Sequence, residues 1–208
     1  MKILIANPGS TSYKCKLYNA DDKTVLFSAV VERIGYKDGI FSYSFADEET
    51  KTINTEIPDY FNAVKLTVDK LQERFSIESV AAVGFKTVVA KGVTGCVELT
   101  NEVVNAMEDY RLLAPVHTDV YVTAINVFKS LLPRTLLVGL FETHFHKNIP
   151  PEAYMYGIPY ELYEKHGIRK YGFHGSSHRY IGKRAKELWN ADKVISCHLG
   201  GSSSVCAV

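Results

Sequence analysis

The sequence predicts an α/β fold in which a sheet is flanked by helices, and two observations support this class. Strand-like runs separated by turn residues fill residues 2–45, and from residue 58 onward helical periodicity alternates with apolar strand-like runs. In addition, a strand, a Gly/Ser turn and a second strand open the chain, and this pattern recurs near its end. A shift of 191 residues places Lys2 on Lys193 and Gly9 on Gly200. The repeat suggests that one structural unit occurs twice.

The first part of the chain is predicted to form strands before any helix. Lys2–Ala6 is apolar and has the length of a buried strand, and Tyr13–Tyr18 alternates hydrophobic and basic residues with period two. Thr24–Val31 and Gly39–Phe45 are predicted as further strands. The polar and acidic residues 46–56 are predicted as a surface loop.

Helices and buried strands are then expected to alternate up to residue 141. The predicted elements are a helix from Pro58-Asp59 to about Phe75, a strand at Ser79–Val89, a helix capped by Thr100 that reaches about Leu113, a helix from the Ala114–His117 break to about Leu132, and a strand at Arg134–Phe141.

The strongest stiff punctuation in the chain is Ile149-Pro150-Pro151. It predicts a boundary between a first domain, residues 1–150, and a second domain, residues 151–208. Beyond it we expect a short helix at Tyr160–His166, a loop at Tyr171–Ser177 and a helix that Ser177 caps and that runs to Trp189. The second hairpin follows. These residues hold too few strands for a sheet of their own, so we expect one complete domain and the beginning of a second.

Composition excludes several classes of function. The 24 basic and 23 acidic residues give a formal charge of +1, which offers no electrostatic basis for binding nucleic acid. The four cysteines show no C-x-x-C spacing, so free thiols in a reducing compartment are expected. No apolar run approaches the roughly 18 residues of a membrane span, and no leader is evident. We therefore expect a cytoplasmic protein without a membrane partner.

Polar clusters fall where predicted strands end, which is where ligands gather in open α/β sheets. They are Asn7–Ser12, Lys86, Glu142–His144 and His198–Ser204. A fifth cluster, Phe173–His178, lies at a helix N-terminus, where free N–H groups favour an anion. Together the clusters suggest phosphate chemistry.

Four of the five clusters, and His117, also have ordinary structural explanations. Asn7–Ser12 could be a plain hairpin tip, Lys86 an edge residue extended to water, and Glu142 a solvated carboxylate. His174 and His178 have the i, i+4 spacing of a metal pair, but no third ligand is evident, and a helix-cap loop explains them more simply. His117, after a proline break, is explained as a residue at a helix start.

Several of these stretches resemble signatures of the acetate kinase family. They are Asn7–Lys14, Ala114–His117, Phe141–His146, Pro151–Tyr154, Tyr171–Tyr180 and Cys197–Ser204, and they follow one another in order over nearly the whole chain. The resemblance implies the actin/Hsp70/sugar-kinase fold, a duplicated ribonuclease-H-like domain. It also implies transfer of the ATP γ-phosphoryl group to acetate or another short carboxylate, assisted by Mg²⁺ or Mn²⁺.

The resemblance also implies roles for individual residues. Asn7 would help hold the metal, Lys86 would grip the carboxylate, and Glu142, His117 and His174 would be catalytic. The remaining implied residues line two kinds of surface: Val88, Val116 and Phe173 the pocket for the acyl methyl group, and Ser10, Ser12, Lys14, His198, Gly200, Gly201 and Ser202 the nucleotide phosphates.

The chain departs from the family pattern at several of these positions. Lys86 stands where the family has arginine, so a point charge replaces a bidentate fork. Glu142 stands where the family has aspartate, and one extra methylene can misplace a carboxylate by about 1 Å. Phe85 replaces a histidine, Val89-Ala90-Lys91 a His-Gly-Gly stretch, and Gly201 an asparagine.

Three functional hypotheses remain open from the sequence. The first is an acetate-kinase-like phosphotransferase whose isolated 208 residues are inactive, because half of the nucleotide site is expected to be missing. The second is a non-catalytic binding subunit that keeps a phosphate or acyl-phosphate pocket. The third is a kinase completed by another chain that supplies the carboxy-terminal half. A homodimer also stays open as a partner.

Overall fold

The computed structural model describes residues 1–208, and the chain divides into two compact units, Met1–Leu140 and Phe141–Val208. This division precedes the Ile149–Pro151 punctuation because the short 3₁₀ helix η3 (Glu142–His146) packs against helix α6 (Gly175–Trp189). None of the helices combines the length and the apolar character that crossing a membrane requires.

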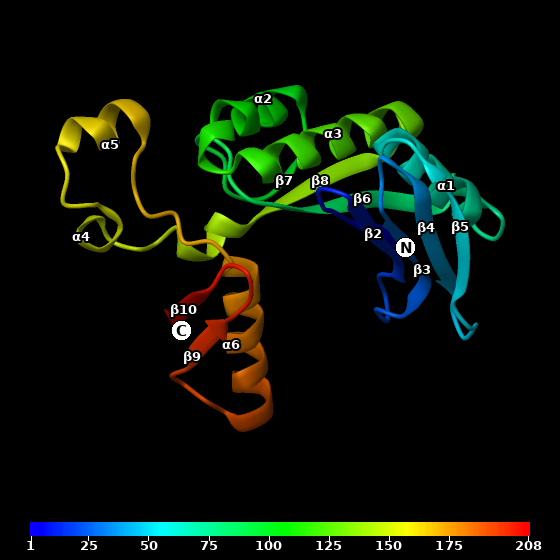
Figure 1. Cartoon of the computed structure of the whole chain (residues 1–208). Coiled ribbons are helices and arrows are strands. Elements are labelled where there is room, and N and C mark those ends of the chain that lie inside the picture. The colour runs from blue at the N-terminus through cyan, green and yellow to red at the C-terminus, as the bar shows by residue number, and fades with distance from the viewer. The chain divides into compact units, whose positions relative to one another are not determined.

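The first unit is built on an eight-stranded sheet in the order β5-β4-β3-β2-β1-β6-β8-β7 (Figure 1). Its strands are β1 (Lys2–Pro8), β2 (Ser12–Asn19), β3 (Val25–Glu32), β4 (Tyr36–Phe45), β5 (Lys51–Ile57), β6 (Val80–Thr87), β7 (Gly95–Glu98) and β8 (Leu136–Phe141). Strands β1 to β5 pair antiparallel in sequence order, whereas β6 adds to β1 in parallel. The predicted antiparallel opening is therefore confirmed.

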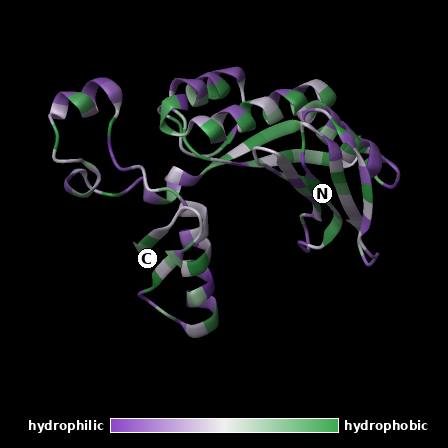
Figure 2. Cartoon of the chain, in the orientation of Figure 1, coloured by the Kyte–Doolittle hydropathy of each residue, from purple (hydrophilic) through white to green (hydrophobic).

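Three helices cover the buried face of this sheet (Figure 1): α1 (Tyr60–Gln72), α2 (Asn101–Asp109) and α3 (Pro115–Leu131). Asp59 caps α1 by accepting a hydrogen bond from the backbone N–H of Asn62, and Thr100 caps α2 in the same way from Val103. Helix α2 ends at Asp109, earlier than predicted, and a 3₁₀ turn follows at Arg111–Leu113. Hydrophobic and hydrophilic residues alternate around the helices (Figure 2), as expected for helices with one face on a sheet.

The core of the first unit lies between the sheet and these helices. In β1 the residues at alternate positions Leu4, Ala6 and Pro8 are buried, whereas Ile5 and Asn7 point to the other face and are exposed. The fully buried Phe128 of α3 packs edge-on against Phe85 of β6, with ring centroids 5.4 Å apart. This contact ties α3 to the centre of the sheet.

The prediction of a surface loop at residues 46–56 is wrong in its second half, because residues 51–57 form strand β5. Every residue of β5 except Ile57 is exposed, so it shows no apolar alternation that could reveal it. Backbone pairing with β4 holds it in register, from Tyr43 opposite Lys51 to Gly39 opposite Thr55. The short strand β7 was also not predicted.

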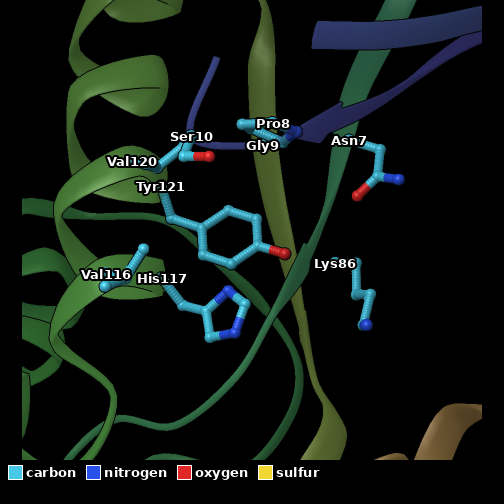
Figure 3. Close-up of a pocket in the computed structure, with 9 residues that line it drawn as sticks. All are labelled: Asn7, Pro8, Gly9, Ser10, Lys86, Val116, His117, Val120 and Tyr121. Carbon is cyan, nitrogen blue, oxygen red and sulfur yellow. The ribbon is translucent and has the colours of Figure 1, made fainter. Parts of the chain in front are cut away.

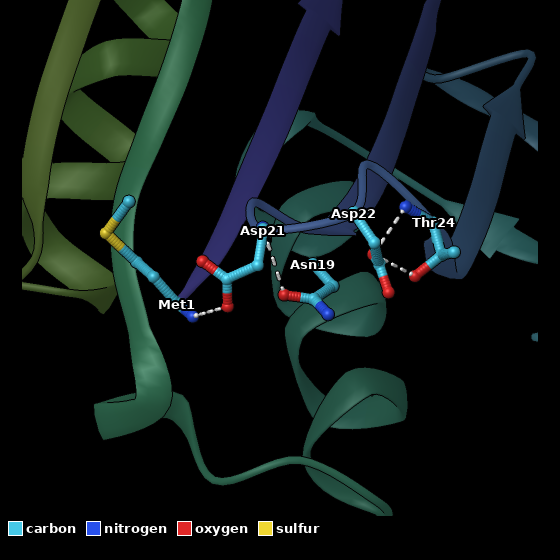
Figure 4. A network of polar contacts seen from close by, with 5 residues as sticks. All are labelled: Met1, Asn19, Asp21, Asp22 and Thr24. Atoms are coloured by element: carbon cyan, nitrogen blue, oxygen red, sulfur yellow. Dashed lines mark hydrogen bonds and ion pairs between the residues drawn. The ribbon is translucent and has the colours of Figure 1, made fainter.

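The turn between β2 and β3 is closed by side chains near the amino terminus (Figure 4). The Asp22 carboxylate accepts hydrogen bonds from the Thr24 hydroxyl at 2.7 Å and from the Thr24 backbone N–H at 2.9 Å, and these bonds lower the pKa of Asp22. The terminal ammonium of Met1 contacts Asp21 at 3.1 Å. This end of the sheet holds no predicted site residue, so the network is structural.

The second unit contains η3, three helices and one hairpin. The helices are α4 (Pro151–Tyr154), α5 (Tyr160–His166) and α6, and the hairpin pairs β9 (Ile195–His198) with β10 (Ser204–Ala207). The predicted second Gly/Ser hairpin is thus confirmed. Its turn is one residue longer than the first, because the last pair of the first hairpin, Pro8 with Tyr13, encloses four residues and the pair His198 with Ser204 encloses five.

Candidate functional site

A pocket of about 240 Å³ in the first unit gathers residues from two of the predicted clusters and from the Ala114–His117 stretch. Its lining consists of Asn7, Pro8, Gly9, Ser10, Lys86, Val116, His117, Val120 and Tyr121. Figure 3 shows His117 and Tyr121 projecting from α3 toward the strands that carry Asn7 and Lys86. Residues more than 100 positions apart in the sequence therefore share one concave surface.

The sheet topology explains why Asn7 and Lys86 meet. Strands β1 and β6 are neighbours and run parallel, with Ala6 opposite Phe85, so their carboxyl ends lie at the same edge. Asn7 and Lys86 each follow one of these partners and point to the exposed face. Helix α3 begins with Pro115 at its first position, and its first turns bring Val116 and His117 to the same edge.

The Gly9–Ser12 turn is held tightly at the rim of this pocket. The backbone N–H of Gly9 donates to the Ser12 carbonyl at 2.7 Å, and the Tyr60 hydroxyl donates to that carbonyl at 2.7 Å. A Cβ at position 9 would lie 2.9 Å from Ser12 Oγ, so the turn is closed around a glycine. Burial raises the pKa of Tyr60 to about 12, so this hydroxyl stays protonated and keeps donating.

The pocket combines one lysine, an imidazole, an amide, the hydroxyls of Ser10 and Tyr121, and apolar side chains. This donor set suits a small anion with a short apolar tail, because the ammonium and hydrogen-bond donors can face the charge while Val116 and Val120 offer apolar contact. Val120 and Tyr121 were not predicted. Their signal was present in the helical period, since each lies four residues after a predicted residue, Val116 and His117.

Three further predicted residues of the first unit do not line the pocket. Lys14 is exposed on β2 directly opposite Asn7, so the two side chains share one face of the hairpin. Ser12 begins β2, and Val88, which follows β6, is 7% exposed.

A second cluster of predicted residues lies in the second unit, around the Gly/Ser turn of the β9–β10 hairpin. The rings of His174 and His198 stack with centroids 4.0 Å apart and an interplanar angle of 16°. The Nδ1 atom of His174 is 2.9 Å from Ser204 Oγ, and its Nε2 atom is 3.2 Å from Ser202 Oγ. Gly200 and Gly201 are exposed at the turn, and Phe173 is half-exposed beside His174.

The prediction that Ser177 caps α6 is wrong. The helix begins three residues earlier than that cap implies, at Gly175, and its N-cap residue is His174 in a left-handed conformation with φ of 62°. Ser177 lies inside the first turn, where its hydroxyl instead contacts His198 Nδ1 at 3.0 Å. The helix can start early because Gly175 lies against η3, where a Cβ would come within 2.2 Å of the Glu142 carbonyl oxygen.

The predicted carboxylate Glu142 is buried, with only 4% of its surface exposed. This excludes the solvated-loop explanation considered from the sequence. Glu142 begins η3, and Gly175 packs closely against its carbonyl oxygen. This contact holds the backbone of Glu142 in place.

His178 is buried in the second unit and lies between two serine hydroxyls. Its Nδ1 atom is 3.0 Å from Ser196 Oγ and its Nε2 atom is 2.8 Å from Ser204 Oγ. Burial lowers the pKa of His178, and the nearby His198 lowers it further. Burial likewise lowers the pKa of His146, whose ring is 6.2 Å from that of His178.

These lowered pKa values predict that the second unit loses stability on acidification. Folded His178 binds a proton less readily than the unfolded chain does, so unfolding takes up protons as the pH falls below the ordinary value of 6.5. The stabilising contribution is present above that pH and lost below it. Urea unfolding followed by the ¹H–¹⁵N resonances of the α6 backbone amides should show lower stability at about pH 5.5 than at about pH 7.5. In His178→Gln this difference should shrink; an unchanged difference would contradict the assignment to His178.

The side chains present fit the metal that the resemblance implies only in part. No three or more His, Cys, Asp or Glu side chains gather in an arrangement that could hold an ion. The pocket does offer oxygen donors, the Asn7 amide and the Ser10 hydroxyl. Mg²⁺ prefers oxygen ligands and retains water and substrate phosphates, so Asn7 fits as a partial ligand and the chain offers no complete cage.

Comparison with known proteins matches residues 2–208 to the acetokinase family model. Acetate kinase of Anoxybacillus flavithermus is 41% identical over 215 aligned residues, and that of Bacillus subtilis is 40% identical. In both cases the alignment covers all of this chain and 54% of the relative. The chain therefore spans about half the length of these relatives.

Solved structures give the same result. Acetate kinase of Porphyromonas gingivalis superposes with a TM-score of 0.87 at 32% identity, and a propionate kinase of Francisella tularensis with 0.92 at 30%. Each match covers the whole chain and 54% of the other protein. The predicted family resemblance and the actin/Hsp70/sugar-kinase fold are confirmed.

Proposed function

Because this chain belongs to the acetokinase family, we propose that it carries the carboxylate and phosphate half of a carboxylate kinase. In this proposal the first unit binds a short acyl phosphate, or the carboxylate from which it forms, and the second unit contacts the transferring phosphoryl group and the nucleotide phosphates. The observation that carries the proposal is the pocket that unites Asn7, Ser10, Lys86, Val116 and His117.

The pocket residues divide the work by their chemistry. The Lys86 ammonium provides the positive charge for a carboxylate or phosphoryl oxygen, and His117 donates a hydrogen bond from its ring. Val116 and Val120 form the apolar wall for a short acyl chain. The Gly9–Ser10 turn supplies backbone N–H and hydroxyl donors to phosphate oxygens.

The second unit supplies donors for a phosphoryl group whose oxygens carry spread negative charge. His174 would face that charge, and His198 and the turn Gly200–Ser202 would face the nucleotide phosphates. The family resemblance assigns Phe173 to the acyl methyl group. Glu142 would be the catalytic carboxylate that the family resemblance implies. Mg²⁺ bound with ATP would neutralise phosphate charge, and Asn7 would contribute an oxygen ligand to it.

Calorimetric titration with acetyl phosphate tests the role of the pocket. The lining contains one lysine and no arginine, so Lys86→Ala should weaken binding at least about tenfold, the loss expected for one charge-assisted contact. Lys86→Arg should bind as tightly or more tightly, because guanidinium offers two parallel donors. Lys16→Ala, which removes an exposed charge of the same hairpin outside the pocket, is the matched control. Equal affinity in Lys86→Ala and Lys16→Ala would refute the assignment.

A second candidate function is binding without turnover. The buried Glu142, one methylene longer than the family's aspartate, and Lys86 in place of arginine favour it. Incubation with Mg-ATP, acetate and hydroxylamine separates the two, since a kinase forms acetyl hydroxamate and a binding protein does not. Activity that arises only after mixing with a separately expressed carboxy-terminal half of a relative would support the two-chain hypothesis.

A further inference from the structure

In the second unit, a series of hydrogen-bonding side chains connects the buried His178 of α6 to the Gly/Ser turn of the β9–β10 hairpin. Ser204 Oγ lies 2.8 Å from His178 Nε2 and 2.9 Å from His174 Nδ1, so one hydroxyl bridges two imidazoles. On its other side His178 contacts Ser196 at 3.0 Å. His174 and His178 are four residues apart and face the same strand pair, β9 and β10.

The bridging hydroxyl restricts how the two rings carry their protons. A serine hydroxyl has one hydrogen, so Ser204 can donate to only one of the two ring nitrogens and must accept from the other if both contacts are hydrogen bonds. When His178 donates from Nε2 to Ser204, the serine is free to donate to Nδ1 of His174. The neutral His174 ring then carries its own hydrogen on Nε2.

This direction of hydrogen bonding, from His178 through Ser204 to His174, suits the proposed function, on which the inference rests. The Nε2 atom of His174 faces the Gly/Ser turn, where Ser202 Oγ lies at 3.2 Å. A nitrogen that stabilises phosphoryl charge must present a hydrogen, and a ring with its hydrogen on Nδ1 would present a lone pair there.

We propose that His178 and Ser204 are positioning residues that hold His174 in the Nε2–H tautomer, with its N–H directed at the Gly/Ser turn. Neither residue needs to touch the substrate. His178 is 1% exposed, and the Ser204 hydroxyl is engaged by the rings of His174 and His178. The arrangement is the same device by which a second residue fixes the ring of a catalytic histidine. Burial also favours the neutral form of His178.

The test is long-range ¹H–¹⁵N correlation NMR of the histidine rings in the full 208-residue chain at about pH 7.5, where a neutral imidazole predominates. The expected result is a His174 ring with hydrogen on Nε2 and an Nδ1 resonance shifted by an accepted hydrogen bond. In Ser204→Ala and in His178→Ala the Nδ1 resonance should move toward the position of a free ring. His178→Gln should restore it in part, because the glutamine amide can donate to Ser204.

Ser203→Ala is the matched control, because the Ser203 hydroxyl contacts only Gly200 in the same turn. It should leave the His174 resonances in place. The inference is overturned if wild-type His174 carries its hydrogen on Nδ1, or if Ser204→Ala leaves the Nδ1 resonance unchanged in a folded protein. If His178→Ala does not fold, Ser204→Ala decides alone. No ligand is present in this experiment, so its failure would leave the proposed function standing, and failure of acetyl phosphate binding would leave the tautomer result standing.

Discussion

Replacing Phe128 by alanine should destabilise the first unit by about 3–5 kcal/mol. Phe128 has no exposed surface and lies between Tyr13 of β2 and Phe85 of β6, with ring centroids 6.2 Å and 5.4 Å away. Its removal leaves a cavity that rigid strands on one side and a long helix on the other cannot close. Because typical domains are stable by only about 5–15 kcal/mol, much of the folded population should be lost on mild heating.

The loss of Phe128 should also disturb the pocket. Phe128 anchors α3, which carries Val116, His117 and Tyr121, to β6, which carries Lys86. Urea unfolding followed by far-ultraviolet circular dichroism gives the stability change. Phe61→Ala removes the same side chain from an exposed position on α1 and should cost far less. Equal losses in the two variants would contradict the core assignment.

Replacing Gly175 by alanine should destabilise the second unit by about 3 kcal/mol. The added Cβ would lie 2.2 Å from the Glu142 carbonyl oxygen and 2.9 Å from Phe145 Cβ. The first of these is a backbone atom, so it cannot turn aside as a flexible side chain can. The gain of about 1 kcal/mol that alanine brings to a helix is too small to offset this clash.

The same substitution should displace the carboxylate side of the candidate site, because Gly175 fixes the spacing between η3 and the start of α6. Urea unfolding followed by the ¹H–¹⁵N resonances of the α6 backbone amides measures the loss in this unit. Gly157→Ala is the matched control, since a Cβ there meets no atom within 4 Å. A Gly175→Ala protein as stable as Gly157→Ala would show that α6 and η3 are not in close contact.

Much of the architecture could be predicted because the relevant signals are local. The apolar run at Lys2–Ala6, the caps Asp59 and Thr100 and the two Gly/Ser turns each depend on a few neighbouring residues. Strand β5 could not, because solvent bathes both of its faces and only backbone pairing with β4 defines it. Nor could the start of α6, which depends on the room that η3 leaves beside Gly175.

The candidate site divides in the same way. Asn7 and Lys86 were predicted from polar residues at strand ends, and the parallel pairing of β1 with β6 explains why they meet. His117, on α3, was assigned to the site only through the family resemblance. Val120 and Tyr121 were missed because they lie one helical turn after Val116 and His117, where an apolar or aromatic side chain is ordinarily read as a core residue. His178 was explained as part of a cap loop, and only the fold reveals the hydroxyl that it shares with His174.

The central claim is that the pocket of the first unit binds a short acyl phosphate, and NMR titration with acetyl phosphate tests it most directly. We expect saturable shifts of the backbone amides of Gly9 and Ser10 and of the His117 ring, with the exposed Lys16 region of the same hairpin unaffected. Lys86→Ala should abolish these shifts at the same concentrations. Saturable shifts that avoid the pocket, or no saturable shift at all in the folded protein, would contradict the claim.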